Sequence, residues 1–197
     1  MIFRSPIIVL DTETTGFPSM GWAHVIELGA VLLDCDGAEL GHFTQVVNPP
    51  VLDGRADKAL SINGIPREEI LAAPNTQTVN SRFLTWAAGA TAVLPFVTAF
   101  NVDFDRPMVW RMGLDLRWAS CIMLRAMEIM GPAGELKPAD PMHPRYDPSR
   151  PYLWPSLAAA GEFFGVPPCE PAHRALSDAR RAAGVAIAIQ RRMKAAA

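Results

Sequence analysis

Two acidic residues follow directly on a short apolar run near the start of the chain. In the stretch VLDTETTG, Asp11 and Glu13 come after the apolar residues 7–10, which are typical of a buried strand. Side chains on a strand alternate between its two faces, so both carboxylates project the same way if the strand continues through them. Carboxylates about 6–7 Å apart repel each other unless a cation lies between them. Taken alone, the pattern is more typical of a strand that frays into a polar loop.

Two further acidic stretches follow later in the chain. The predicted strand over residues 93–100 leads into NVDFD, which contains Asp103 and Asp105, and HRALSD places Asp178 near the start of the last predicted helix. In an open α/β sheet, functional groups gather at the carboxyl ends of the strands, and an aspartate on the last helix can reach the same edge. Carboxylates that converge there require metal ions, and Mg²⁺ and Mn²⁺ prefer oxygen ligands of this kind. Asp103 and Asp105 share a face if their stretch is extended, so spacing alone leaves both open as ligands.

The elements that must hold these acids alternate between strands and helices. Apolar runs and helical periodicity, punctuated by glycine and proline, predict a hairpin region followed by βαβ units, which is an α/β pattern. The predicted strands cover residues 7–10, 25–33, 43–47, 93–100 and 116–119, and the predicted helices cover 79–89, 107–112, 122–130, 156–164 and 176–193. Seven prolines between residues 131 and 155 prevent regular structure there. We expect one domain over residues 1–197, with residues 131–155 as a surface insertion.

The bulk composition narrows the class of protein. Half of the residues are hydrophobic and the mean hydropathy is +0.13, which indicates a globular chain. We find no apolar run of the roughly 20 residues that a membrane span needs, no signal peptide and only three distant cysteines, so we expect a cytoplasmic protein without disulfides. The net charge of −2 is unlike the basic footprint of most nucleic-acid binders. Two bound divalent cations would supply positive charge where a phosphate lies.

Three motifs together make the chain resemble a known enzyme family. DTETTG, FNVDFDRP and HRALSD occur in the order and approximate spacing of the exonuclease motifs of the DEDDh 3′–5′ exonucleases. That family includes the epsilon proofreading subunit of bacterial DNA polymerase III and ribonuclease T. The resemblance covers roughly residues 6–190, and SINGIPREEI and SLAAAGEFFGVP resemble the family's segments between the motifs. It implies a ribonuclease H-like fold with a mixed five-stranded sheet flanked by helices.

The resemblance also implies a role for each motif residue. It implies that two divalent cations, Mg²⁺ or Mn²⁺, are bound by Asp11, Glu13, Asp105 and Asp178, that His173 is the general base, and that Thr14, Phe17, Ile65 and Asn101 bind substrate. The family's ligand comes directly after the aromatic residue of the second motif, which favours Asp105 over Asp103. His173 precedes Asp178 by five positions, or roughly 140° around a helix, so His173 must lie in or before the first helical turn.

The leading hypothesis is a metal-dependent 3′–5′ exonuclease that releases nucleoside 5′-monophosphates from DNA or RNA by a two-metal mechanism. The expected partner is a nucleic acid with a 3′ end, in first place single-stranded DNA, and no membrane. The sequence leaves a polymerase or a second copy of the chain open as partners. The alternatives are an RNA-trimming exoribonuclease of the same family and a catalytically silent interaction module. A dinucleotide-binding domain is excluded because no G-x-G-x-x-G follows the first strand.

Two features of the sequence bear on the choice of substrate. The family often has histidine at the positions of Asn63 and Phe100, and we expect these differences to affect substrate preference rather than catalysis. The insertion interleaves basic and aromatic side chains, which can grip a single strand, although long loops are often only connectors. The residues concerned are Lys137, Arg145, Tyr146, Arg150, Tyr152 and Trp154.

Overall fold

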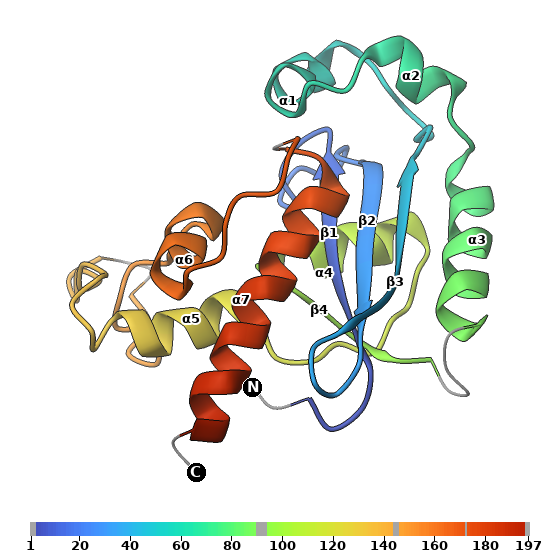
Figure 1. Cartoon of the computed structure of the whole chain (residues 1–197). Coiled ribbons are helices and arrows are strands. Elements are labelled where there is room, and N and C mark those ends of the chain that lie inside the picture. The colour runs from blue at the N-terminus through green and yellow to red at the C-terminus, as the bar shows by residue number, and fades with distance from the viewer. Residues whose placement is uncertain (1–2, 90–93, 144–145, 172, 196–197) are drawn as a thin grey trace.

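The computed structural model describes residues 3–89, 94–143, 146–171 and 173–195, and it is built around one mixed sheet (Figure 1). The strand order is β3-β2-β1-β4, with β1 at Ile7–Thr14, β2 at Val25–Leu33, β3 at Glu39–Val46 and β4 at Phe96–Ala99. β2 pairs antiparallel with both β1 and β3, whereas β4 runs parallel to β1. The predicted mixed sheet flanked by helices is therefore confirmed. Residue 93, the start of the predicted fourth strand, lies outside the described residues.

The sheet has four strands where five were predicted. The segment over residues 116–119 runs beside β4, but only one isolated bridge, between Val97 and Trp118, joins the two. The Val97 N–H donates to the Arg117 carbonyl at 2.8 Å, and the Ala119 N–H donates to the Val97 carbonyl at 2.7 Å. This segment is therefore an extended neighbour of β4 that is too short to form a fifth strand.

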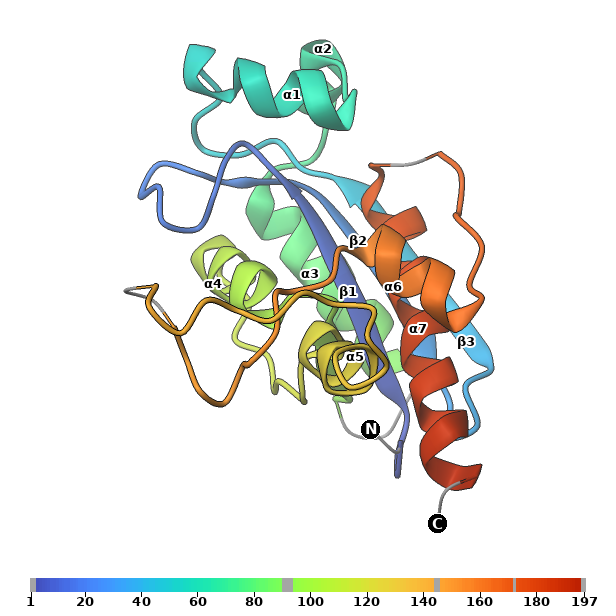
Figure 2. The same cartoon turned by 90° about the vertical axis from the view of Figure 1, so that its left-hand side faces the viewer.

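Helices cover both faces of the sheet (Figure 2). They are the 3-10 turn η1 at Gly54–Ala56, α1 at Asp57–Asn63, α2 at Arg67–Ala72, α3 at Thr76–Gly89, α4 at Val102–Met112, α5 at Ile122–Met130, α6 at Leu157–Phe164 and α7 at Ala175–Ala195. Helix α4 was predicted to begin at Pro107 but begins five residues earlier, because the Asn101 carbonyl accepts hydrogen bonds from the N–H groups of Phe104 and Asp105. Helix α6 is capped by Ser156, whose hydroxyl accepts a 3.1 Å hydrogen bond from the Ala159 N–H. Within the described residues, no helix combines the length and hydropathy that crossing a bilayer requires.

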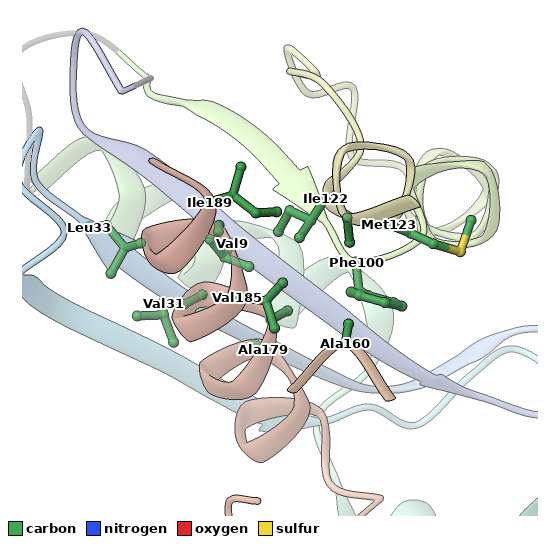
Figure 3. Close-up of a cluster of buried hydrophobic side chains, with 14 of the residues drawn as sticks. Val9, Val31, Leu33, Phe100, Ile122, Met123, Ala160, Ala179, Val185 and Ile189 are labelled. Atoms are coloured by element: carbon green, nitrogen blue, oxygen red, sulfur yellow. The ribbon is translucent and has the colours of Figure 1, made fainter. Parts of the chain in front are cut away.

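Alternation along β1 divides its apolar side chains between two cores. Ile7 and Val9 pack under α5, α6 and α7, together with Val31 of β2 and Ile189 of α7 (Figure 3). Ile8 and Leu10 point to the opposite face, where α3 and α4 cover them. The two layers hold β1 rigidly along its whole length, so that its polar carboxyl end has a fixed position.

Two segments lie outside these layers. Helices α1 and α2 lie beyond the carboxyl end of β1 (Figure 1) and rest on a small cluster formed by Ile26, Ile65 and Ile70. The described part of the proline-rich segment over residues 131–155 contains no helix or strand and only one isolated bridge, between Pro138 and Tyr152. Pro144 and Arg145, which belong to the predicted insertion, lie outside the described residues.

Candidate active site

The carboxyl end of β1 carries two acidic side chains on one face. β1 continues to Thr14, so Asp11 and Glu13 alternate with the buried Thr12 and share a face of the sheet, as predicted. Asp178, in the first turn of α7, faces them from the helix above. Carboxylate oxygens of Asp11, Glu13 and Asp178 all lie within 4.8 Å of one another, which is close enough for one cation to bind all three.

Helix α7 reaches this position because β2 has no side chain at the point of contact. Gly29 pairs in register with Asp11, and a Cβ atom on it would lie 2.2 Å from the carbonyl carbon of Ala175. Any other residue there would push the start of α7 away from the sheet. The close packing at Gly29 therefore sets the distance between Asp178 and β1.

Asp105 lies outside the set of three carboxylates that fall within 4.8 Å of one another, but its charge acts on Asp11. β4 pairs with β1 only as far as Leu10, so the edge of β1 is open from Asp11 onward and the first turn of α4 lies beside it. The Asp105 side chain is 3% exposed and accepts a 2.8 Å hydrogen bond from the hydroxyl of Thr12. The hydroxyl of Thr12 thus orients the carboxylate of Asp105, a role that sequence reasoning did not identify. Asp103, the alternative ligand that the spacing left open, is exposed, and its Oδ2 atom lies 3.4 Å from Nη1 of Arg150.

Burial and mutual repulsion disfavour the ionised form of these acids. Burial raises the pKa of Asp11 well above its usual range, and the charges of Asp105, Glu13 and Asp178 add to the effect. Burial, with repulsion by Asp178 next in size, raises the pKa of Glu13 from 4.5 to about 8. Burial raises the pKa of Asp105 to about 7 against the opposing hydrogen bond from Thr12, and burial also raises the pKa of Asp178. The protein alone does not compensate this charge.

His173 lies directly before α7, as its spacing predicted. It adopts a left-handed backbone conformation with φ of 57°, and its side chain is exposed. Its charge lowers the pKa of Asp178 against the larger effect of burial, which places the imidazole within electrostatic reach of that carboxylate. The imidazole therefore lies exposed at the rim of the acidic cluster.

A cavity of about 450 Å³ opens beside Glu13. Its walls include two of the predicted substrate-binding residues, Thr14 and Phe17, and the Phe17 ring is 62% exposed. Phe17 meets Phe104 edge to face with ring centroids 6.4 Å apart. The wall also contains residues that sequence reasoning missed, because loops and α1 bring them there from distant parts of the chain: Trp22, Arg55, Lys58 and Ile62.

The other two predicted substrate-binding residues lie elsewhere. Ile65 is 2% exposed and packs against Ile26 and Ile70, so it does not line the cavity; Ile62, which is 59% exposed, does. Asn101 stands just before α4, and its side-chain oxygen is buried without a hydrogen-bond partner in the described part of the chain. An unsatisfied buried oxygen at this point is available to a group that the protein itself does not supply.

Comparisons with known proteins agree with this geometry. Residues 8–186 match the model of a family described as exonuclease. A protein of Mycobacterium tuberculosis (strain CDC 1551 / Oshkosh), whose name describes it as a bifunctional exonuclease/endonuclease, is 28% identical over 195 residues. The match covers 96% of this chain, which spans about a quarter (27%) of the relative's length.

Solved nuclease structures share the fold. The cell-death related nuclease CRN-4 matches with a TM-score of 0.70 at 16% identity, over 97% of this chain and 64% of that one. E. coli exonuclease I in complex with a dT13 oligonucleotide matches with a TM-score of 0.69 at 18% identity, over 98% and 42% of the two chains. A 3′-exonuclease that recognises the histone mRNA stem-loop matches with a TM-score of 0.69 at 17% identity, over 96% and 65%. With its family match, its three motifs and this ribonuclease H-like fold, the chain belongs to the exonuclease family, in its DEDDh branch.

Proposed function

We propose that the protein is a metal-dependent 3′–5′ exonuclease that removes nucleoside 5′-monophosphates from single-stranded DNA. The observation that carries the proposal is the cluster of Asp11, Glu13 and Asp178, whose carboxylate oxygens lie within 4.8 Å of one another, with Asp105 of α4 close enough to raise the pKa of Asp11. The family requires divalent metals, and the proposal extends this to two Mg²⁺ or Mn²⁺ ions at these residues. We also propose that residues 1–197 act as one exonuclease domain with residues 131–155 as an insertion.

The donor atoms of the site are those that a divalent cation prefers. Its donors are carboxylate oxygens, the ligands that hard divalent cations prefer. Burial raises the pKa of Glu13 and of Asp178 although nearby cations oppose it, namely Arg174 at Glu13 and His173 and Arg181 at Asp178. Arg174 is moreover paired with Glu27, with Nη2 and Oε1 2.7 Å apart. Bound divalent cations would acidify a water molecule and stabilise the departing 3′-oxygen.

The chain's own side chains supply the remaining steps in this proposal. His173, exposed at the rim, accepts the proton of the attacking water, a role that histidine side chains serve more often than any other in enzymes. The cavity beside Glu13 receives the terminal nucleotide, whose base packs on Phe17 and Ile62. Contacts of this kind accept any base, because every base presents an apolar face. Arg55 and Lys58 on the cavity wall are placed to attract phosphate.

The similar structures bear on the choice between DNA and RNA. The similar structures include one with a DNA oligonucleotide and one that recognises an mRNA stem-loop, at the same TM-score of 0.69. We place single strands first because the cavity wall offers apolar and aromatic side chains that stack on unpaired bases, and DNA first because the similar structure of exonuclease I holds a dT13 oligonucleotide. An exoribonuclease of the same family is the second candidate, favoured by the similarity to the mRNA-directed enzyme.

A substrate panel tests the proposal. Single-stranded DNA, duplex DNA and RNA, each labelled at the 5′ end, are incubated with the protein and Mg²⁺ or Mn²⁺. We expect a ladder that shortens from the 3′ end, fastest on single-stranded DNA, and no ladder with chelator or with Asp11→Asn. Faster loss of RNA would reverse the substrate assignment. If no substrate is degraded with either metal, the chain is a silent interaction module on this fold.

A further inference from the structure

Glu27 is a buried carboxylate that the proposed reaction leaves without a role. It is the third residue of β2, its side chain is 2% exposed, and it pairs in register with Glu13 of β1. Residues opposed across antiparallel strands point to the same face, with Cβ atoms about 4.5–5.5 Å apart. Glu27 therefore adds negative charge beside a cluster that already repels itself. A buried charge is costly unless other groups bind it closely.

Both oxygens of Glu27 are bound from the start of α7. The Arg174 guanidinium donates from Nε to Oε1 at 3.0 Å and from Nη2 to Oε1 at 2.7 Å. The Ala175 N–H donates to Oε2 at 2.9 Å, and Arg174 Nε lies 3.1 Å from the same oxygen. The N–H groups of a first helical turn have no partner within the helix, so Glu27 caps α7 from a neighbouring strand. Because both oxygens are occupied, Glu27 is not part of the cation-binding set.

These bonds hold Arg174 and Ala175, the two residues that follow His173 at the start of α7. Ala175 rests against the backbone of β2 at Gly29, where a Cβ atom would not fit. Arg174 also reaches Glu69 of α2, with Nη2 and Oε1 3.5 Å apart, and so links the sheet to the segment above the cavity. His173 itself is exposed and has a left-handed backbone conformation with φ of 57°. The ion pair therefore fixes the main chain immediately after His173 while its imidazole remains free.

We propose that Glu27 and Arg174 are positioning residues for the nuclease reaction. Their ion pair fixes the turn that carries His173, so that the imidazole meets the attacking water beside Asp11, Glu13 and Asp178. The inference rests on the proposed function, because it assigns the pair an effect on proton transfer. Neither residue contacts the reacting atoms. A displaced general base loses rate steeply, since an error of about 1 Å can cost roughly 10²-fold.

Arg174→Met, measured alone and combined with His173→Ala, separates positioning from simple stability. The rate of a single turnover on 5′-labelled single-stranded DNA is measured at saturating metal, together with Mn²⁺ affinity by calorimetry. We expect Arg174→Met to lower the rate by about 10²-fold with unchanged Mn²⁺ affinity. In the His173→Ala background the same change should cause no further loss, because residues that act through one group are not additive.

The chain offers a matched control on the same helix. Arg180 of α7 binds Glu39 of β3 with Nη2 and Oε1 3.0 Å apart, away from the acidic cluster. Arg180→Met removes a comparable link between helix and sheet, and we expect it to retain the wild-type rate. If Arg174→Met unfolds at too low a temperature to be assayed, Arg174→Lys replaces it in the same two backgrounds. Lysine keeps the positive charge but cannot make the bidentate contact of arginine.

The outcomes distinguish this inference from the proposed function. An equal loss of rate in both backgrounds would assign the pair a structural role and overturn the inference. A wild-type rate for Arg174→Met would do the same while the exonuclease proposal stands. A wild-type protein that degrades no nucleic acid with either metal would instead overturn the proposed function, and the inference with it.

Discussion

Replacing Glu13 by glutamine should stabilise the protein in the absence of metal. Glutamine has nearly the same size and shape as glutamate but carries no charge. Burial and repulsion by Asp178 raise the pKa of Glu13 from 4.5 to about 8 in the folded protein. Between these two values the folded protein holds a proton that the unfolded chain has released. The contribution of Glu13 to stability is therefore complete below pH 4.5 and is lost as the pH rises to about 8.

The size of the effect at pH 7 follows from the same numbers. One pKa unit corresponds to about 1.4 kcal/mol, so the interval between pH 4.5 and pH 7 amounts to about 3 kcal/mol at most. The Glu13 carboxylate is partly exposed, and screening by water reduces this value, so we expect Glu13→Gln to raise the free energy of unfolding by about 1–3 kcal/mol. For a chain of this length each kcal/mol raises Tm by about 2–4 °C. The variant should nevertheless be nearly inactive, because it lacks one of the proposed ligands.

Thermal unfolding of chelator-treated protein between pH 4.5 and pH 8.5 measures the effect. We expect the Tm of the wild type to fall across this range more steeply than that of Glu13→Gln, and added Mg²⁺ to raise the wild-type Tm more at high pH than at low pH. Glu162→Gln, an exposed substitution on α6, is the control and should change stability by less than about 0.5 kcal/mol. A metal-free Glu13→Gln that melts several degrees below the wild type at pH 7 would refute the reasoning, since it would mean that the carboxylate makes stabilising contacts.

Four further outcomes are expected. His173→Ala should lower the chemical rate by roughly 10²–10⁴ while calorimetry shows nearly unchanged Mn²⁺ binding; lost metal affinity would make the imidazole a ligand. Thr12→Val removes the hydrogen bond that opposes the raised pKa of Asp105, so the pH dependence of metal binding should move to higher pH, and an unchanged profile would contradict that role. Trp154, which is 51% exposed, should bind single strands by stacking, and Trp154→Ala should weaken binding by about 1–3 kcal/mol in a filter assay. Tyr152→Ala should instead lower Tm, because the Tyr152 ring lies directly on Gly131, and an unchanged Tm with weakened strand binding would reverse these two roles.

The local sequence pattern correctly predicted the position of site residues that depend on a single strand or helix. Period-two alternation placed Asp11 and Glu13 on one face, and five-residue spacing placed His173 before α7; the structure agrees with both. The prediction of a fifth strand was wrong because a short apolar segment does not reveal how many of its residues can pair, and in this segment only Trp118 forms a bridge. The prediction that α4 begins at Pro107 was also wrong. Proline is common at the start of a helix, but here it lies inside α4.

Features that depend on distant contacts could not be predicted from the sequence. Ile62 and Ile65 have the same apolar character, but Gly64 ends α1 in a left-handed conformation and turns Ile65 down into the core. Glu27 did leave a signal, because a glutamate inside the apolar stretch VIELGAVLL needs a partner if that stretch is buried. Nothing local identifies Arg174, 147 positions later, as that partner.

The helix that carries Asp178 shows how the fold tolerates a self-repelling site. The buried face of α7 is made largely of alanine, with Ala179, Ala182 and Ala186 all inaccessible to solvent. Small side chains let the helix axis lie close to the sheet, and Gly29 removes the last obstacle at its start. Apolar packing along the rest of α7, which includes Ile189, holds the helix against the repulsion among the carboxylates. Packing along α7 therefore offsets part of the free energy that it costs to gather carboxylates at this end of the sheet.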